Sequence, residues 1–164
     1  MMKFINATSQ THMELVRELF REYAGAIGVD LAYQDFEQEL ALLPGKYAEP
    51  KGLIILLAYV DDQLAGCVAV RQVALTQCPK ACEMKRLYVR PQYRNLQIGK
   101  HLVDLITPHA KTAGYSCLLL DTLPTMEKAI SLYERLGFMK IKPYYESPVI
   151  GTTYFKLGIS NQAS

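Results

Sequence analysis

The most informative stretch of the sequence is a polar loop between an apolar segment and an amphipathic one, LYVRPQYRNLQIGKHL, residues 87–102. The apolar segment predicts a strand, and the spacing of the apolar residues that follow predicts a helix beginning near Ile98. The N–H groups of a helix's first turn have no partner within the helix and suit a phosphate or diphosphate. Gly99 allows close approach of the backbone, and Arg94 and Lys100 add positive charge. An ordinary strand-to-helix connection fits the same residues, so both interpretations stay open.

Composition and charge narrow the classes of function. The chain has 164 residues, of which 50% are hydrophobic and 21% charged, a globular balance. A net charge of +2 lacks the dense basic stripe of a nucleic-acid binder, so we expect no nucleic-acid partner. The local excess of cations lies at Lys85, Arg86, Arg90, Arg94 and Lys100. These can bind a phosphate-bearing small molecule, and they also fit a solvated surface.

The apolar runs are too short for a membrane helix, which needs about 20 residues. The longest, Leu53–Val60, has the length of a strand, and the first residues lack the apolar core of a secretory signal. We therefore expect a cytoplasmic protein without a membrane partner.

The four cysteines predict neither a metal site nor disulfides. Cys67 and Cys117 lie in apolar runs and are expected as small core residues. Cys78 and Cys82 have a spacing found in metal sites, but no second pair and no nearby histidine completes one. Free thiols, as in a cytoplasmic protein, are the expectation.

Hydrophobic periodicity predicts the elements that position the polar loop. Strands are expected at 4–7, 52–60, 64–73, 82–89, 116–121, 138–141 and 152–157, and helices at 12–26, 36–43, 99–113 and 126–136. Asp61-Asp62-Gln63 predicts a hairpin turn, and Pro108 should kink the third helix or cut it short. Strand 152–157 is expected to be exposed, where it can pair across a homodimer.

This order predicts one α/β domain that spans residues 1–164. Hairpins in the first half and a β-α-β unit in the second predict a mixed sheet with helices on both faces. The succession of strand, loop, helix and strand over residues 82–121 is where an α/β protein binds a ligand.

Two motifs resemble the GNAT (general amine N-acetyltransferase) superfamily. The first is Leu87-Tyr88-Val89-Arg90-Pro91 followed by Arg94-Asn95-Leu96-Gln97-Ile98-Gly99, and the second is Asp121, Ala129, Tyr133 and Leu136-Gly137-Phe138. Gln97 and Asn95 stand where relatives have glycines, so we expect a less sharply turned loop that keeps its backbone N–H groups. Met126 stands where many relatives have an asparagine that contacts the cofactor.

The resemblance implies acetyl-CoA as cosubstrate, no metal, and a mostly antiparallel sheet with one splayed parallel strand pair. The implied cofactor residues are Leu87, Tyr88 and Val89 through their backbone, the loop residues Arg94, Asn95, Leu96, Gln97, Ile98, Gly99 and Lys100, and Met126. The N–H near Tyr88 would stabilise negative charge developing on the thioester carbonyl.

The resemblance also implies an acid and a base. Attack needs a neutral amine, and an alkyl ammonium with a pKa of about 10.4 is mostly charged at neutral pH. Glu83 is the candidate base, directly or through a water, although it can simply pair with Lys85, and alternation would put it on the face opposite Tyr88. Tyr133 is the candidate acid for the CoA thiolate, although its spacing alone also fits a core residue.

Candidate substrate residues are fewer. Arg71 or Arg86 can bind a carboxylate of an amino-acid-like acceptor in a bidentate pair, and Tyr144 and Tyr145, in PYYESP, can close over the acceptor. These residue types are also common at surfaces and on edge strands.

The predicted function is acetyl transfer to a primary amine of a small molecule by direct attack in a ternary complex. A protein N-terminus or lysine is an alternative acceptor, but it needs an open and usually acidic groove. The acidic residues Asp35, Glu37, Glu39 and Glu49 are a modest basis for one. A non-catalytic acyl-CoA sensor is a second alternative, disfavoured by the presence of Tyr133 and the loop.

Overall fold

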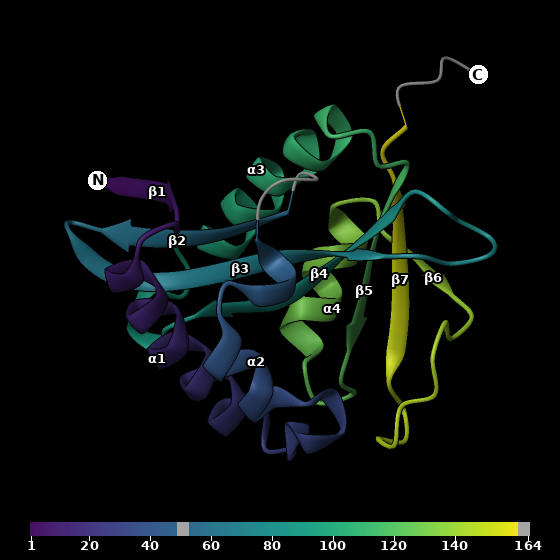
Figure 1. The fold of residues 1–164 in the computed structure, drawn as a ribbon, viewed down its shortest axis with the longest axis horizontal. Coiled ribbons are helices and arrows are strands. Elements are labelled where there is room, and N and C mark those ends of the chain that lie inside the picture. Colours follow the sequence, from purple (N-terminus) through teal and green to yellow (C-terminus); the bar gives the residue numbers. More distant parts are fainter. Residues whose placement is uncertain (49–52, 161–164) are drawn as a thin grey trace.

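The computed structural model describes residues 1–48 and 53–160 (Figure 1). Gly52, where a strand was expected to begin, and Glu49 of the acidic group lie outside these ranges. Within them, no helix is both long enough and apolar enough to cross a membrane.

One seven-stranded sheet runs through the molecule in the order β1-β2-β3-β4-β5-β7-β6. All neighbouring strands are antiparallel except β4 and β5, which confirms the mixed and mostly antiparallel sheet. The strands are β1 (Met2–Asn6), β2 (Ile54–Val60), β3 (Gln63–Val73), β4 (Ala81–Val89), β5 (Cys117–Thr122), β6 (Met139–Ile141) and β7 (Thr153–Gly158).

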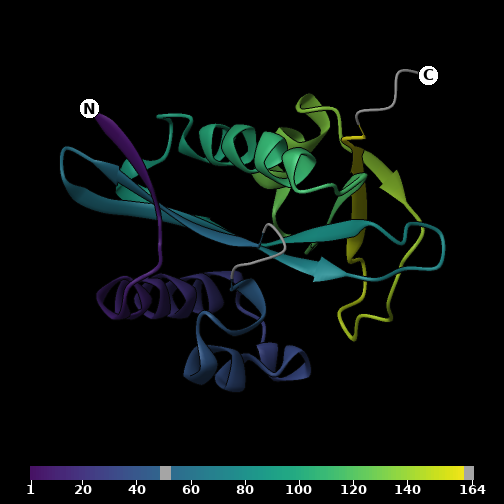
Figure 2. The same ribbon diagram turned by 45° about the horizontal axis from the view of Figure 1, so that its top comes forward.

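Helices cover both faces of the sheet, as expected. In Figure 2, α1 (Gln10–Ile27) and α2 (Phe36–Leu42) lie beneath the sheet, and α3 (Ile98–Thr112) and α4 (Glu127–Arg135) lie above it. Alternation along β2 and β3 supplies apolar residues to both faces, so each face has its own buried cluster. Three short 3₁₀ helices, η1 (Leu31–Gln34), η2 (Gly45–Tyr47) and η3 (Pro91–Tyr93), were not expected from the sequence.

Local sequence explains where the long helices begin and end. Ser9 caps α1 by accepting a hydrogen bond from the His12 N–H at 3.0 Å, and Gly28 ends it with a φ of 68°. Helix α3 continues through Pro108 to Thr112, so the expectation that proline would cut it short is wrong.

Strand β7 lies between β5 and β6 rather than at an edge. Its backbone is paired on one side over Thr153–Gly158 and on the other with β6. The prediction that this strand is exposed and free to pair across a homodimer is therefore wrong, because β6 pairs with its second edge.

Cys78, before β4, forms a disulfide with Cys117, the first residue of β5. The prediction of free thiols is therefore wrong for these two residues, whereas Cys67 and Cys82 are free and buried. The parallel pairing of Ala81 with Cys117 brings the end of the β3–β4 loop beside β5. This proximity depends on sheet topology, so spacing along the sequence could not indicate it.

Candidate active site

The site is built around a β-bulge in the middle of β4. Ala69 of β3 lies opposite Lys85, but Cys67 lies opposite Tyr88, so β4 contains one extra residue over this interval. Arg86 adopts the left-handed conformation there, with a φ of 61°. Gly66 accommodates the bulge, because a Cβ at this position would lie 2.5 Å from the carbonyl oxygen of Tyr88.

The bulge changes which side chains share a face. Glu83, Lys85 and Tyr88 lie opposite residues 71, 69 and 67 of β3, which alternate onto a single face. The expectation that Glu83 and Tyr88 lie on opposite faces is therefore wrong, because the extra residue restores them to the same side. That face is the one packed against α1 and α2.

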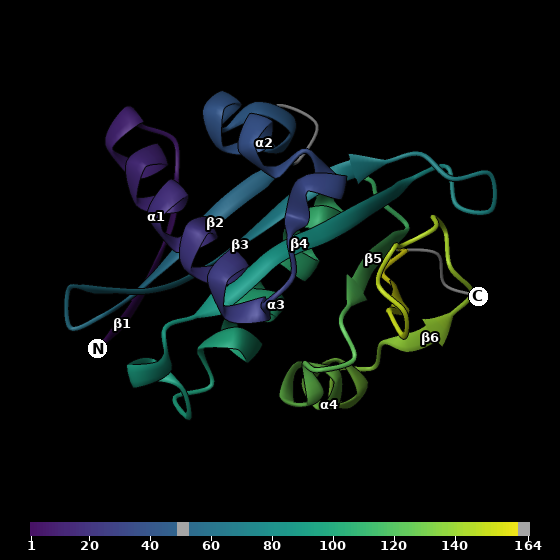
Figure 3. The ribbon, with the colours of Figure 1, turned by 90° about the horizontal axis from the view of Figure 1, so that it is seen from below.

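Strands β4 and β5 pair only from Ala81–Cys117 to Glu83–Leu119 and then diverge (Figure 3). This confirms the splayed parallel pair. A narrow crevice of about 30 Å³ lies in the opening. Its lining includes three of the residues that the sequence assigned to cofactor binding or catalysis, Leu87, Met126 and Tyr133.

The polar loop from β4 to α3 has two residues with positive φ, Asn95 and Gln97. Asn95 has a φ of 76° and Gln97 a φ of 61°, so both residues adopt the conformation that glycine favours. The two substitutions therefore leave the glycine-like backbone conformation in place. No side chain caps the start of α3, where the amides of Ile98, Gly99 and Lys100 open the helix.

The charged side chains of this loop have partners in the structure. Arg94 Nε donates to the carbonyl oxygen of Val89 at 3.1 Å, and Lys100 Nζ lies 2.9 Å from an oxygen of Asp104. Arg94, Asn95, Leu96, Gln97 and Lys100 are all exposed. The charged side chains of the loop therefore lie at the surface.

Tyr133 of α4 is buried against the sheet. Its ring centroid lies 5.7 Å from that of Phe138 and 6.0 Å from that of Phe155. Burial, with smaller contributions from Tyr23 and Asp121, raises the pKa of Tyr133 well above its usual value. The hydroxyl therefore stays protonated at neutral pH.

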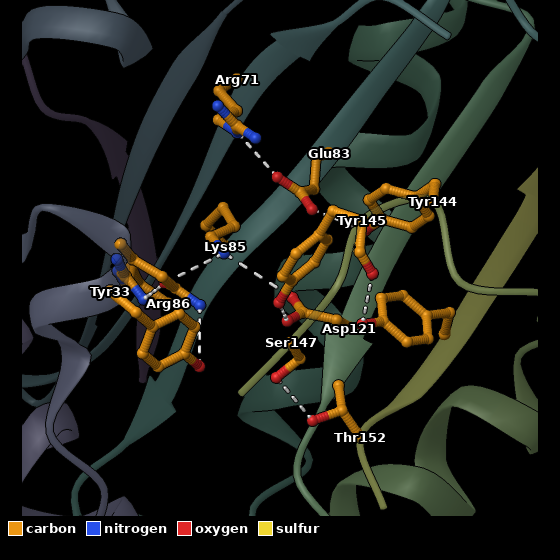
Figure 4. A network of polar contacts seen from close by, with 12 residues as sticks. Tyr33, Arg71, Glu83, Lys85, Arg86, Asp121, Tyr144, Tyr145, Ser147 and Thr152 are labelled. Atoms are coloured by element: carbon orange, nitrogen blue, oxygen red, sulfur yellow. Dashed lines mark hydrogen bonds and ion pairs between the residues drawn. The ribbon is translucent and has the colours of Figure 1, made fainter. Parts of the chain in front are cut away.

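Glu83 is 1% exposed and holds two partners on the α1/α2 face (Figure 4). Its Oε1 accepts a hydrogen bond from Arg71 Nε at 2.7 Å, and its Oε2 accepts one from the Tyr144 hydroxyl at 2.5 Å. Burial, followed by the charge of Glu83, raises the pKa of Tyr144. Three predicted site residues thus meet in one network.

A second network lies where β4 and β5 separate. Lys85 Nζ lies 3.6 Å from Asp121 Oδ1, and the Tyr145 hydroxyl donates to the same carboxyl group (Figure 4). Lys85 Nζ also donates to Gln34 Oε1 at 3.2 Å. The loop after β6 thus contacts the open end of β5 through Tyr145, as well as Glu83 through Tyr144.

Arg86 is directed toward α2 and is 3% exposed. Its Nε and Nη2 donate to both carboxylate oxygens of Glu39, at 3.0 and 2.9 Å, and its Nη1 donates to Gln34 Oε1 at 2.8 Å. The guanidinium also lies 5.7 Å from the ring centroid of Tyr23 and 5.2 Å from that of Phe36. Its donors therefore bind other parts of the protein.

A larger cavity of about 600 Å³ lies between these networks and α2. Glu83, Lys85, Arg71 and Tyr145 line it. Tyr33, Gln34 and Lys85 also line the crevice, so the two spaces adjoin at these residues.

Sequence reasoning missed several residues of this wall. Lys46 pairs with Glu39 at 3.0 Å, and Tyr47 of η2 and Tyr33 of η1 line the cavity. Asp121, which lines the crevice, was noted as part of a motif but was given no role. These residues are identified by their position in the folded protein, because the short helices η1 and η2 leave no hydrophobic periodicity in the sequence.

Metal ligands do not gather anywhere in residues 1–48 and 53–160: no group of three or more His, Cys, Asp and Glu side chains has an arrangement suited to a metal ion.

Comparison with known proteins identifies the family. Residues 13–138 match the model of the acetyltransferase (GNAT) family. An uncharacterized N-acetyltransferase of Schizosaccharomyces pombe is 39% identical over 142 residues, covering 87% of this chain and 85% of that protein. One from Dictyostelium discoideum is 30% identical, covering 83% of this chain and 89% of that protein.

Solved structures have the same fold. A GNAT-family acetyltransferase of Staphylococcus aureus aligns with a TM-score of 0.77 and 20% identity over 97% of this chain and 99% of that one. The yncA protein of Salmonella typhimurium, solved with its cofactor acetyl-CoA, aligns with a TM-score of 0.72 and 15% identity over 99% and 96%. The chain belongs to the acetyltransferase (GNAT) family and is an acyltransferase of the N-acetyltransferase type.

Proposed function

We propose that residues 1–164 form one acetyltransferase domain, which transfers acetyl from acetyl-CoA to a primary amine of a small molecule. The observation that carries the proposal is the pair of adjoining spaces at the open end of β4 and β5. One is narrow and lies where β4 and β5 separate. The other is wide, and charged side chains such as Arg71, Glu83 and Lys85 lie among the apolar surface that lines it.

The residues along the first space fit acetyl-CoA. The amides at the start of α3 have no side-chain cap and suit a diphosphate, with Arg94 and Lys100 nearby. Beyond Glu83, β4 is not paired with β5, so the backbone of Leu87, Tyr88 and Val89 can pair with the pantetheine arm, although the Val89 carbonyl already accepts from Arg94 Nε. The neighbour from Salmonella typhimurium, solved with acetyl-CoA, supports this assignment.

In this proposal Tyr133 is the general acid. The amine nitrogen attacks the thioester carbonyl, the carbon–sulfur bond breaks, and the Tyr133 hydroxyl protonates the leaving sulfur. Burial raises the pKa of Tyr133, so the hydroxyl is protonated throughout the neutral range but is a weaker acid than a free tyrosine. A backbone N–H near Tyr88 stabilises the negative charge on the carbonyl oxygen.

The proposed base is Glu83, acting through a water. Its carboxylate is buried next to the wide cavity and on the same face as Tyr88. Its two oxygens already accept hydrogen bonds from Arg71 and Tyr144, which orient it and leave lone pairs for a further donor. Glu83 keeps the proton that it receives, because the Arg71 guanidinium is a donor only and cannot accept one.

The proposed acceptor lies in the wide cavity. Arg71 contacts Glu83 through Nε, and in this proposal its Nη1 and Nη2 bind a carboxylate of the acceptor. Tyr144 and Tyr145 hold the loop over the site. For Arg86 the contacts favour a positioning role, because its guanidinium is bound by Glu39 and Gln34. A small acceptor is favoured over a protein because loop residues Tyr145, Glu146 and Pro148 form one wall of the cavity.

The test is release of free CoA from acetyl-CoA in the presence of single amines. The panel pairs amino acids with the matching decarboxylated amines, so that the carboxylate is the difference within each pair. Saturable, amine-dependent release supports the proposal, and a preference for the amino acid supports the role of Arg71. Acetyl-CoA binding without turnover on any small amine, but with turnover on peptides, would contradict a small-molecule acceptor.

A further inference from the structure

The crevice between β4 and β5 contains a polar group that the proposed chemistry does not use. Thr122, the last residue of β5, is 4% exposed and lines the crevice. Its hydroxyl oxygen makes no hydrogen bond with any part of the chain that the structure describes. A buried hydroxyl without a partner costs free energy comparable to that of a lost hydrogen bond, so native structures seldom keep one without a reason.

The surroundings of Thr122 do not explain its hydroxyl. Alternation along β5 puts Thr122 on the face of Leu118 and Leu120, which belong to the apolar cluster beneath α3 and α4. Leu87 and Tyr133 line the crevice beside it. Valine has nearly the same shape and would fill this place without an unsatisfied polar atom.

The backbone of Thr122 is fixed, and so is the direction of its side chain. Thr122 pairs with Thr153 of β7 and lies three residues beyond Leu119, the last residue of β5 that pairs with β4. Thr122 therefore lines the crevice beyond the paired part of the two strands, together with Tyr133. A β-branched side chain has few rotamers there, so the oxygen is oriented in advance.

We propose that the Thr122 hydroxyl binds an amide of the pantetheine arm of acetyl-CoA. This inference rests on the proposed function and adds to it a specific contact in the crevice. An amide offers one donor and one acceptor, and a threonine hydroxyl can serve either one. The cosubstrate thus supplies the partner that the protein does not.

The test combines two measurements on Thr122→Val. Removing an unsatisfied buried hydroxyl should raise the unfolding midpoint of the free protein, by about 2 °C for a chain of this size. The same change should weaken acetyl-CoA binding about 3- to 10-fold in calorimetry, because one hydrogen bond is lost. Stability and affinity therefore move in opposite directions, which a residue needed only for folding would not produce.

Two further variants serve as controls. Thr122→Ser keeps the hydroxyl and should retain the affinity of the unaltered chain for acetyl-CoA. Thr107→Val removes a hydroxyl that donates to the Val103 carbonyl within α3 and does not line the crevice, so it should leave the affinity unchanged.

The outcomes separate the inference from the proposed function. If the unaltered chain binds acetyl-CoA and Thr122→Val binds it equally well, the hydroxyl makes its hydrogen bond to water rather than to acetyl-CoA, and the inference is wrong. If Thr122→Val loses both stability and affinity, the residue has a structural role and the inference is again wrong. If the unaltered chain does not bind acetyl-CoA, the proposed function fails and the assignment of Thr122 fails with it.

Discussion

At the scale of single residues, Tyr133 links the core to the chemistry. Its ring belongs to a buried aromatic cluster with Phe138 and Phe155, while it also lines the crevice between the splayed strands. A core role and a catalytic role are therefore compatible, and the two interpretations of its spacing need not compete.

Replacing Tyr133 with phenylalanine tests the catalytic role. The variant keeps the ring and loses the proton donor, so kcat should fall about 100-fold or more, the usual contribution of general acid catalysis. Calorimetry should give an unchanged affinity for acetyl-CoA. Unaltered turnover in Tyr133→Phe would exclude the hydroxyl as the acid.

Gln97 is a second residue whose backbone matters more than its side chain. It precedes α3 with a φ of 61°, which is strongly disfavoured for β-branched residues. Gln97→Val should therefore destabilise the protein by about 1–2 kcal/mol and weaken acetyl-CoA binding, because the loop must adopt another conformation.

Gln97→Gly is the matched control, because glycine adopts the same backbone conformation without strain. It should bind acetyl-CoA as the unaltered chain does, in the same titration. Equal affinities for the valine and glycine variants would show that the loop backbone does not form the phosphate site.

At the scale of elements, α2 and β4 are joined by a buried ion pair. Arg86 donates to both oxygens of Glu39, and Lys46 contributes a third contact. Glu39→Gln would leave the buried guanidinium without a full counter-charge. The free energy of unfolding should fall by about 3 kcal/mol, measured with denaturant. Glu37→Gln, an exposed neighbour on the same helix, should change it by less than about 0.5 kcal/mol.

The same pair predicts a dependence on pH. Burial acts to raise the pKa of Glu39, but the hydrogen bonds and charges of Arg86 and Lys46 outweigh it and lower the pKa overall. The stabilisation by Glu39 is therefore fully present above its unfolded pKa, about 4.3, and is lost as pH falls below it. The difference in stability between the unaltered chain and Glu39→Gln should shrink in acid. A constant difference would contradict this origin.

The bulge in β4 depends on Gly66 of the neighbouring strand. A Cβ there would lie 2.5 Å from the Tyr88 carbonyl oxygen, which is backbone and cannot move aside cheaply. Gly66→Ala should cost about 2 kcal/mol or more of unfolding free energy. Gly25→Ala is the control, because no atom lies within 4 Å and helix propensity favours alanine. Similar effects of the two changes would rule out a close fit at the bulge.

The same bulge marks the limit of prediction from sequence. Hydrophobic periodicity located every strand and α-helix to within a few residues, because burial on one or both faces leaves a direct pattern. It could not locate the extra residue at Arg86, since a bulge leaves the composition of β4 unchanged. That one residue decides that Glu83 and Tyr88 share a face.

At the scale of the whole molecule, the sheet brings distant segments to one place. The proposed site combines η1 and α2 from the first third of the chain, β3 and β4 from its middle, and α4 with the loop after β6 from its last third (Figure 1). The two sequence motifs predicted the residues on the acetyl-CoA side of the proposed site. The acceptor side, including Lys46 and Tyr47, depends on tertiary contacts between irregular segments and could not be predicted.

The most direct test of the account is calorimetric titration of the protein with acetyl-CoA, repeated on a double variant, Arg94→Ala with Lys100→Ala. Both side chains are exposed on the loop at the start of α3, so the double variant should fold normally. The account predicts micromolar binding, at about −8 kcal/mol, by the unaltered chain and clearly weaker binding by the double variant. No binding by the unaltered chain would contradict the cosubstrate site, and equal binding by both would contradict its location at this loop.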